Sequence, residues 1–383
     1  MASGKAPVSL AGKKLLFLVT EDWALISHRL PLALAAMDQG MHVLVLARTG
    51  DRADYLRSLG LEVHHVPFER GSLNPFSDLT LLMHIVRLYR QLRPDVVHHV
   101  ALKPVIYGGL AARLTGMKHV VNALPGLGFV FSSSTLTARL LKPFVRAVLR
   151  SVLAVPGSRL ILQNQDDVRM FTREGLAPER SIRFVPGVGV DLDAYSRAPE
   201  PDGRVRIVLP ARMLVDKGVN EFVEAARLLH ARGIDADFVL VGGIDADNPA
   251  ALKAEQLRAW EHAGLVSWSG HCTDMPAMLA SAHIVCLPSY REGLPKALLE
   301  ACAAARPIVT TDVPGCREVV RDGENGLLVR VRDARDLADK LATLIADRSL
   351  RWRMGQTGRR IAEREYSAAL SSEQTISIYR ELL

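Results

Sequence analysis

The sequence is poor in aromatic residues, in cysteines and in long apolar runs. Aromatic residues make up 5% of the 383 positions, and the four cysteines, all in the second half, include no CxxC pair. This pattern excludes a disulfide-rich fold and a zinc ribbon. No stretch approaches the ~20 apolar residues of a transmembrane helix, and the first residues show no signal-peptide pattern. We therefore expect a cytoplasmic protein with reduced thiols.

The overall composition is that of a soluble globular protein. Apolar residues make up 49% of the chain and charged residues 23%. A chain of 383 residues exceeds what one hydrophobic core usually supports, so two domains are expected. The net charge of +7 favours an acidic partner. Nucleic acid is not the expected one, because the sequence has no RNA-binding motif and few aromatic residues to stack bases.

Short apolar segments alternate with helical patterns along the chain. This alternation predicts parallel strands joined by crossover helices, which is a doubly wound α/β arrangement. A stretch rich in Pro, Gly and charge at 196–204 separates two such series and predicts a linker. The predicted domains are therefore residues 1–198 and 199–366. The segments predicted as strands are 14–19, 42–47, 96–100, 119–124, 205–211, 237–243, 282–288 and 306–311.

The most informative segment follows a predicted buried strand and is SYREGLPKALLEA, residues 289–301. Pro295 suits the first position of a helix, whose free amides and dipole favour a phosphate group. Glu292 and Glu300 lie on either side of this helix start, at most ~12 Å apart if the segment were helical. Such a pair could bracket a nucleotide sugar, with Glu300 on the ribose and Glu292 on the hexose. Chance is the alternative, because the helix dipole by itself favours glutamate there.

Two cations follow another predicted strand, in the segment PARMLVDKG. Arg212 and Lys217 lie five positions apart on a loop that enters a predicted helix. A planar guanidinium and a compact ammonium at the carboxyl end of a strand could offset the charge on a departing nucleoside diphosphate. Ordinary solvated charges near a turn are the alternative.

These segments resemble those of the family 4 retaining glycosyltransferases. The resemblance runs through PARMLVDKGVNEFVEAARLL, FVLVGG, LPSYREGLPKALLEA and VPGCREVVRDGENGLLV, and covers most of residues 205–330. It implies the GT-B fold, in which two Rossmann-like domains face each other across a cleft. The C-terminal helix, here 367–383, would cross back onto the first domain. A UDP-sugar would be the co-substrate, with no cofactor and no metal.

The resemblance also implies roles for individual residues. Arg212 and Lys217 would grip the diphosphate, and Glu292, the third catalytic residue, would contact the transferred sugar. The acceptor hydroxyl would attack on the face that the diphosphate leaves, and a phosphate oxygen would take its proton. The residues implied to bind the donor are Gly243, Gly293, Leu294, Pro295, Lys296 and Glu300.

The first domain is expected to hold the acceptor. Parts of it resemble bacterial enzymes that extend saccharides linked to undecaprenyl diphosphate. His28, Lys103 and Asn122 are the candidate acceptor-binding residues, and a core or surface histidine and a surface lysine are the alternatives. Two features depart from the family: the first loop lacks its common Gly-Gly, and NALPG stands where many members have a histidine or an acidic group. The segments that carry the resemblance are 70–76, 102–116 and 122–131.

Residues 134–155 predict an amphipathic helix with one basic face. A stripe of this kind suits an anionic lipid surface, whereas a packed helix with a solvated basic face is the alternative. Together with a lipid-linked acceptor, the stripe predicts a peripheral protein on the cytoplasmic face of the inner membrane. The basic residues, at spacings of 3, 4 and 4, are Arg139, Lys142, Arg146 and Arg150.

Three Asp-x-Asp patterns could instead indicate the metal site of sugar transferases with another fold. They are Asp191/Asp193, Asp235/Asp237 and Asp245/Asp247. The first two suit turns, and only the third closely follows a predicted strand, so no metal site is predicted.

The predicted function is transfer of a hexose or N-acetylhexosamine from a UDP-sugar to a polyprenyl-diphosphate-linked saccharide. Such a reaction belongs to bacterial assembly of O-antigen, capsule or glycoprotein glycans. One alternative is a UDP-sugar epimerase on the same fold. The other is a non-catalytic basic protein that binds lipid or nucleic acid.

Overall fold

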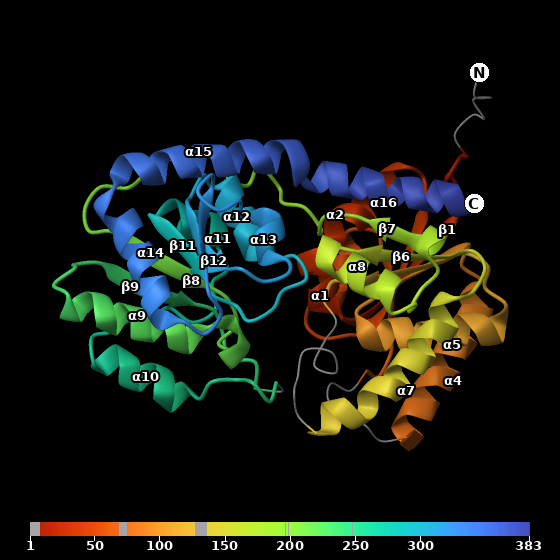
Figure 1. The fold of residues 1–383 in the computed structure, drawn as a ribbon. Coiled ribbons are helices and arrows are strands. Elements are labelled where there is room, and N and C mark those ends of the chain that lie inside the picture. The colour runs from red at the N-terminus through yellow and green to blue at the C-terminus, as the bar shows by residue number, and fades with distance from the viewer. Residues whose placement is uncertain (1–7, 69–74, 127–135, 196, 198, 247) are drawn as a thin grey trace. The chain divides into compact units, whose positions relative to one another are not determined.

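The chain folds into two compact units (Figure 1). The structure, a computed structural model, describes residues 8–68, 75–126, 136–195, 197, 199–246 and 248–383. The first unit comprises Met1–Val188 with Ala368–Leu383, and the second comprises Gly189–Ser367.

The division between the units precedes the predicted boundary at residue 198. The Val190 N–H donates to the Tyr366 carbonyl oxygen at 2.8 Å, and Tyr195 is buried in a core cluster of the second unit. Val190 and Tyr195 belong to the second unit, because the residues that they contact lie there.

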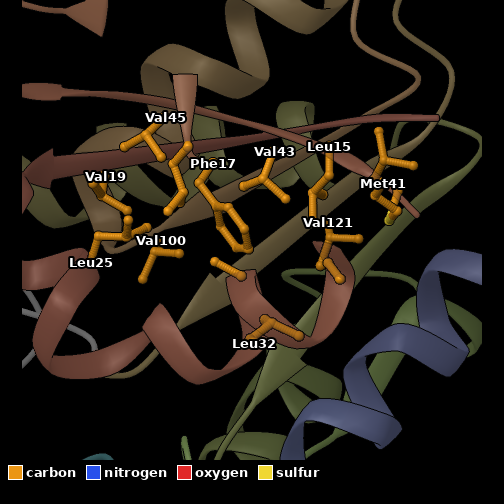
Figure 2. Close-up of a cluster of buried hydrophobic side chains, with 14 of the residues drawn as sticks. Leu15, Phe17, Val19, Leu25, Leu32, Met41, Val43, Val45, Val100 and Val121 are labelled. Carbon is orange, nitrogen blue, oxygen red and sulfur yellow. The ribbon is translucent and has the colours of Figure 1, made fainter. Parts of the chain in front are cut away.

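The first unit is built on a seven-stranded parallel sheet with the order β3-β2-β1-β4-β5-β6-β7. Its strands are β1 (Lys14–Glu21), β2 (His42–Arg48), β3 (Glu62–His65), β4 (Val96–Val100), β5 (Val120–Leu124), β6 (Ser158–Leu162) and β7 (Ile182–Phe184). Both faces of β1 are buried, because Leu15 and Phe17 enter one apolar cluster while Leu16 and Leu18 enter another. Figure 2 shows the first cluster, where Phe17 lies among valines of neighbouring strands.

Helices cover both faces of this sheet. Residues of α2 (Leu30–Asp38) and α16 (Ala368–Leu382) complete the cluster around Phe17, whereas residues of α4 (Pro75–Leu92) and α5 (Leu102–Thr115) complete the cluster on the opposite face. The helices of the first unit are α1 (Asp22–His28), α2 (Leu30–Asp38), α3 (Ala53–Ser58), α4 (Pro75–Leu92), α5 (Leu102–Thr115), α7 (Leu136–Leu153), α8 (Gln165–Arg173), the 3₁₀ turn η1 (Glu179–Ser181) and α16 (Ala368–Leu382).

The second unit has a six-stranded parallel sheet with the order β10-β9-β8-β11-β12-β13. Its strands are β8 (Arg206–Pro210), β9 (Asp237–Val241), β10 (Ser267–Trp268), β11 (Ile284–Leu287), β12 (Ile308–Thr311) and β13 (Gly326–Val329). Its helices are η2 (Val215–Lys217), α9 (Val219–Ala231), α10 (Ala254–His262), α11 (Met275–Ala280), α12 (Lys296–Ala303), α13 (Cys316–Val319), α14 (Ala334–Ala346) and α15 (Arg348–Glu365).

The α/β prediction is confirmed, and all eight predicted strands are present. The five further strands are short, from two to five residues, and most lie towards the sheet edges, where apolar runs are weakest. Pro295 is the residue before α12 rather than its first residue. No helix in the described parts of the chain is long and apolar enough to cross a membrane.

A buried polar network lies inside the first unit. His99, on β4, bonds the Tyr89 hydroxyl through Nε2 and the Asn122 side chain through Nδ1, both at 2.8 Å. The neighbouring His98 Nδ1 lies 2.6 Å from the Tyr379 hydroxyl on α16. Burial lowers the pKa of His99 to about 4 and holds that of His98 well below its usual range. Both imidazoles are therefore neutral at physiological pH.

Candidate active site

The loop between β11 and α12 holds a largely buried ion pair with the last residue of η2. The Lys217 ammonium lies 2.5 Å from Glu292 Oε1, and the Ser289 hydroxyl donates to the same oxygen at 2.8 Å. The two charged side chains are only 18% and 12% exposed. Glu292 Oε1 therefore accepts from both groups, and this contact fixes the position of the Lys217 ammonium.

Close backbone packing brings these two loops together. Gly218 has φ +74°, and a Cβ placed there would lie 2.1 Å from the Pro288 carbonyl oxygen. The Tyr290 N–H also donates to the Asp216 carbonyl oxygen at 2.9 Å. Only glycine permits this approach, which places Lys217 beside the end of β11.

Glu300 lies inside α12 and is largely buried. Its Oε1 is 3.3 Å from the Lys296 ammonium, one turn earlier in the helix. The Tyr195 hydroxyl hydrogen-bonds the same carboxylate, and the pKa of Tyr195 is raised, first by burial and then by the charge of Glu300. Glu300 thus has hydrogen-bond partners already in place before any nucleotide binds.

Arg212 does not join the pair of Lys217 and Glu292. Its guanidinium forms an ion pair with Asp245, which follows β9, and about half of the arginine side chain is exposed. Asp247, the other half of the third Asp-x-Asp pattern, lies outside the described residues. Within the described part of the chain, no group of three or more His, Cys, Asp or Glu side chains could hold a metal ion.

Gly242 and Gly243 let the end of β9 approach the loop that carries Arg212. Gly242 has φ +151°, and a Cβ there would lie 1.8 Å from the Ala211 carbonyl oxygen. The Met213 N–H donates to the Gly243 carbonyl oxygen at 3.0 Å. The two predicted segments, PARMLVDKG and FVLVGG, are therefore adjacent at the carboxyl edge of one sheet.

Two further groups border the Lys217–Glu292 pair. The Tyr290 hydroxyl donates to Glu221 Oε1 at 2.8 Å, and burial raises the pKa of Tyr290 to about 12. Burial likewise raises the pKa of the Cys316 thiol, near Glu292 and Lys217, to about 12. Neither residue is a nucleophile at neutral pH, because the ionised form is disfavoured.

The three predicted acceptor residues lie on three different elements of the first unit. His28 is exposed at the end of α1, and Lys103 is the second residue of α5, directly after β4. Asn122 is fully buried, and its amide bonds His99 and, at 3.1 Å, the Ser158 hydroxyl. The structure therefore contradicts a contact between Asn122 and an acceptor, because both ends of the amide serve the core of the first unit.

Sequence reasoning missed a polar cluster at the carboxyl end of β1. Glu21 and Asp22 are buried there, whereas Trp23 remains 41% exposed. Glu21 pairs with Arg48 and accepts from the indole N–H of Trp23. The pattern that could have revealed it is Glu-Asp-Trp directly after an apolar strand.

The predicted basic face of α7 is partly used within the protein. Arg146 forms an ion pair with Glu174, and Arg150 donates to the carbonyl oxygens of Glu174 and Gly175 at 2.7 and 3.2 Å. The Arg139 side chain lies outside the described residues. The stripe is therefore not a free row of four cations, because two of its arginines hold the end of α8.

Exposed apolar side chains gather instead on α4. Phe76, Leu79 and Met83 recur on one side of the helix, and Phe76 is 82% exposed. Arg87 and Arg90 continue the same face towards the end of the helix. Such a face suits the boundary between lipid headgroups and acyl chains.

Comparison with known proteins gives a family match in each half of the chain. Residues 14–159 match the family model described as glycosyl transferase 4-like, and residues 195–361 match the model of glycosyl transferases group 1. The chain belongs to the family 4 glycosyltransferases. The two matched regions fall in the first and the second unit, so each unit of this GT-B enzyme carries its own part of the family pattern.

Similar proteins include enzymes of bacterial glycan assembly. The chain is 28% identical to the N,N'-diacetylbacillosaminyl-diphospho-undecaprenol alpha-1,3-N-acetylgalactosaminyltransferase of Campylobacter jejuni, over 96% of this chain and 98% of that protein. It is 26% identical to the UDP-Gal:alpha-D-GlcNAc-diphosphoundecaprenol alpha-1,3-galactosyltransferase of Escherichia coli, over 80% of each. Among solved structures, sucrose-phosphate synthase of Thermosynechococcus elongatus superposes with a TM-score of 0.80, at 19% identity over 97% of this chain and 99% of that one.

Proposed function

We propose that this glycosyltransferase moves a hexose or N-acetylhexosamine from a UDP-sugar to a polyprenyl-diphosphate-linked saccharide, with retention of anomeric configuration. The observation that carries the donor side is the buried pair of Lys217 and Glu292 at the carboxyl edge of the second sheet. Ligands of doubly wound folds bind at this edge, and a fixed ammonium there suits a phosphate.

Lys217 would stabilise the departing diphosphate. Charge grows on the β-phosphate as the bond to the sugar breaks, and a cation already in position avoids the cost of reorganising solvent. Glu292 holds this ammonium at 2.5 Å and would contact a hydroxyl of the transferred sugar. The acceptor hydroxyl would attack on the side that the diphosphate leaves, passing its proton to a phosphate oxygen. No protein base is then required.

Arg212 would exchange its partner during binding. In the structure its guanidinium pairs with Asp245, and its half-exposed side chain leaves the fork accessible to a second anion. A diphosphate offers the oxygen geometry that a guanidinium binds with two parallel hydrogen bonds. Arg212 and Lys217 would together supply the positive charge that a metal supplies in other transferases, so the proposed reaction is metal-independent.

Glu300 would bind the nucleoside. Its carboxylate is already supported by Lys296 and Tyr195, and a carboxylate in such a site accepts well from ribose hydroxyls. The amides of Gly293 and Leu294 and the start of α12 would lie near the diphosphate, because the loop before α12 connects Glu292 to the helix.

The acceptor class is proposed from the relatives and the surface of the first unit. Both relatives named above act, by their names, on saccharides linked to undecaprenyl diphosphate. The apolar and basic face of α4, with Phe76 and Arg87, supports peripheral attachment to an anionic membrane where such an acceptor resides. We therefore place the enzyme on the cytoplasmic face of the inner membrane.

The proposal is tested by incubating the protein with a panel of UDP-sugars and bacterial membrane lipid extract. Mass spectrometry should detect one added hexose or N-acetylhexosamine on a lipid-linked saccharide. NMR of the product should show the anomeric configuration of the donor, and EDTA should leave the rate nearly unchanged. An inverted product would refute retention, and rescue of an EDTA-treated enzyme by Mn²⁺ or Mg²⁺ would refute metal independence.

A further inference from the structure

Trp23 is an exposed tryptophan whose polar group is already satisfied inside the protein. It follows β1 directly, and 41% of its surface is exposed, whereas the two acidic residues before it are buried. Exposing a large indole costs free energy in water. What distinguishes Trp23 from a singly exposed apolar side chain is that its indole N–H is bonded within the protein.

Buried carboxylates hold the indole in one orientation. The indole N–H donates to one oxygen of Glu21, and the other oxygen of Glu21 accepts from Arg48 on β2. The backbone N–H of Trp23 donates to Asp22 Oδ1 at 2.7 Å, and the backbone N–H of Gly50 donates to Asp22 Oδ2 at 2.6 Å. The conformational entropy of fixing the ring is thus lost on folding rather than on binding a ligand.

Trp23 lies at the start of α1, just past the carboxyl end of β1. β1 is paired with β2 on one side and with β4 on the other, and all three strands are parallel. Ligands of doubly wound sheets bind at the carboxyl ends of such strands. Lys103 is the second residue of the helix after β4, the strand next to β1, and paired strands are ~5 Å apart.

A flat apolar ring and a cation that follow the carboxyl ends of two paired strands match one particular chemistry. A glycosyl diphosphate joins a pyranose, which has an apolar C–H face, directly to two phosphates. An indole offers a large rigid contact surface for such a face, and an ammonium attracts the phosphates. Neither a free sugar nor a free diphosphate would use both groups.

We propose that Trp23 is a stacking platform for the sugar ring that is bonded directly to the diphosphate of the lipid-linked acceptor. Glu21 is a positioning residue that fixes the platform through the indole N–H. This inference rests on the proposed function, because it assumes that the acceptor is a saccharide on a lipid diphosphate.

The test uses intrinsic fluorescence and steady-state kinetics on the full chain. The probes are farnesyl-diphosphate-linked N,N'-diacetylbacillosamine, farnesyl-diphosphate-linked N-acetylglucosamine, farnesyl diphosphate without sugar, and UDP. The variants are Trp23→Ala, Trp23→Phe and Glu21→Gln. Trp352→Phe is the matched control, because Trp352 is also an exposed tryptophan, 62% exposed, but lies on α15 in the second unit.

At least one sugar-bearing probe should change the fluorescence of the wild type and of Trp352→Phe, but not that of Trp23→Phe. Trp23→Ala should raise the KM for that probe by about tenfold or more, while kcat and the KM for the UDP-sugar change by less than about twofold. Trp23→Phe should recover most of the affinity, because a ring is restored. Glu21→Gln should give an intermediate KM.

The platform is overturned if neither sugar-bearing probe changes the fluorescence, or if farnesyl diphosphate alone gives the same change. It is also overturned if Trp23→Ala leaves the acceptor KM unaltered, or if UDP-sugar rather than the acceptor probe produces the Trp23 signal. Release of UDP by the wild type tests the proposed function separately. Fluorescence change without UDP release would refute the transferase proposal and leave the platform standing.

Discussion

The coupling between Lys217 and Glu292 is the part of the site that a double-mutant cycle measures most directly. The perturbations are Lys217→Met, Glu292→Gln and the two combined. In the structure the ammonium and the carboxylate are 2.5 Å apart and mostly buried. A hydrogen bond between charged groups of this kind contributes about 1.5–3 kcal/mol. Removing a preorganised donor from a developing charge lowers kcat by about a hundredfold to a thousandfold.

Lys217→Met removes that donor and leaves the Glu292 carboxylate uncompensated near the diphosphate, so we expect a loss of kcat of about a hundredfold to a thousandfold. Glu292→Gln leaves an ammonium without its charged partner and lowers kcat by a similar factor. The double variant should be less than about tenfold slower than the slower single variant, because the two residues act as one unit. Rates should be measured in single turnover, so that release of UDP does not hide the chemical step.

Ser289→Ala is the matched control. Ser289 donates to the same Glu292 oxygen at 2.8 Å but carries no charge, so its removal should cost less than about tenfold in kcat. Urea unfolding of each variant separates lost stability from lost catalysis. Multiplicative effects of the two single substitutions would refute the idea that Lys217 and Glu292 work as a pair.

Three further outcomes follow from burial and packing. Glu300→Gln should weaken UDP binding by about tenfold to a hundredfold in calorimetry with a smaller change in kcat, because it removes a charged acceptor; unchanged affinity would contradict the ribose contact. Gly218→Ala should lower the free energy of unfolding by at least about 2 kcal/mol, because its Cβ would lie 2.1 Å from the Pro288 carbonyl oxygen. Gly175→Ala, at φ +58° with open space around it, is the control and should cost about 1 kcal/mol. In the folded protein the pKa of His99 is lowered to about 4, so the unfolded chain takes up a proton at a higher pH than the folded protein does. The contribution of His99 to the free energy of unfolding should therefore be complete above about pH 6.5 and should fall by about 3 kcal/mol towards pH 4. A urea midpoint that stays constant over this range would contradict the burial of a neutral His99.

The sequence by itself determined the α/β class and the elements that carry the proposed donor site. Buried parallel strands are apolar along their whole length, so a run such as KLLFLV identifies a strand without knowledge of its neighbours. The exit loop with Glu292 and the helix start after Pro295 are also local features. Each depends on a short stretch of chain, and each was predicted within one or two residues of its position in the structure.

Only the tertiary structure decided which polar side chains meet. Lys217 and Glu292 are 75 positions apart, and no periodicity in the sequence relates them. The sequence around Asn122 does not show whether this residue is buried within its strand or exposed at the end of the strand. Its hydrogen-bond partner His99 lies on the neighbouring strand, β4. In the sequence Arg146 resembles a free surface cation, but in the structure it forms an ion pair with Glu174, at the end of α8. A side chain's charge is a local property, but its partner is set by chain crossovers and close backbone approaches, such as that at Gly218, which only folding brings about.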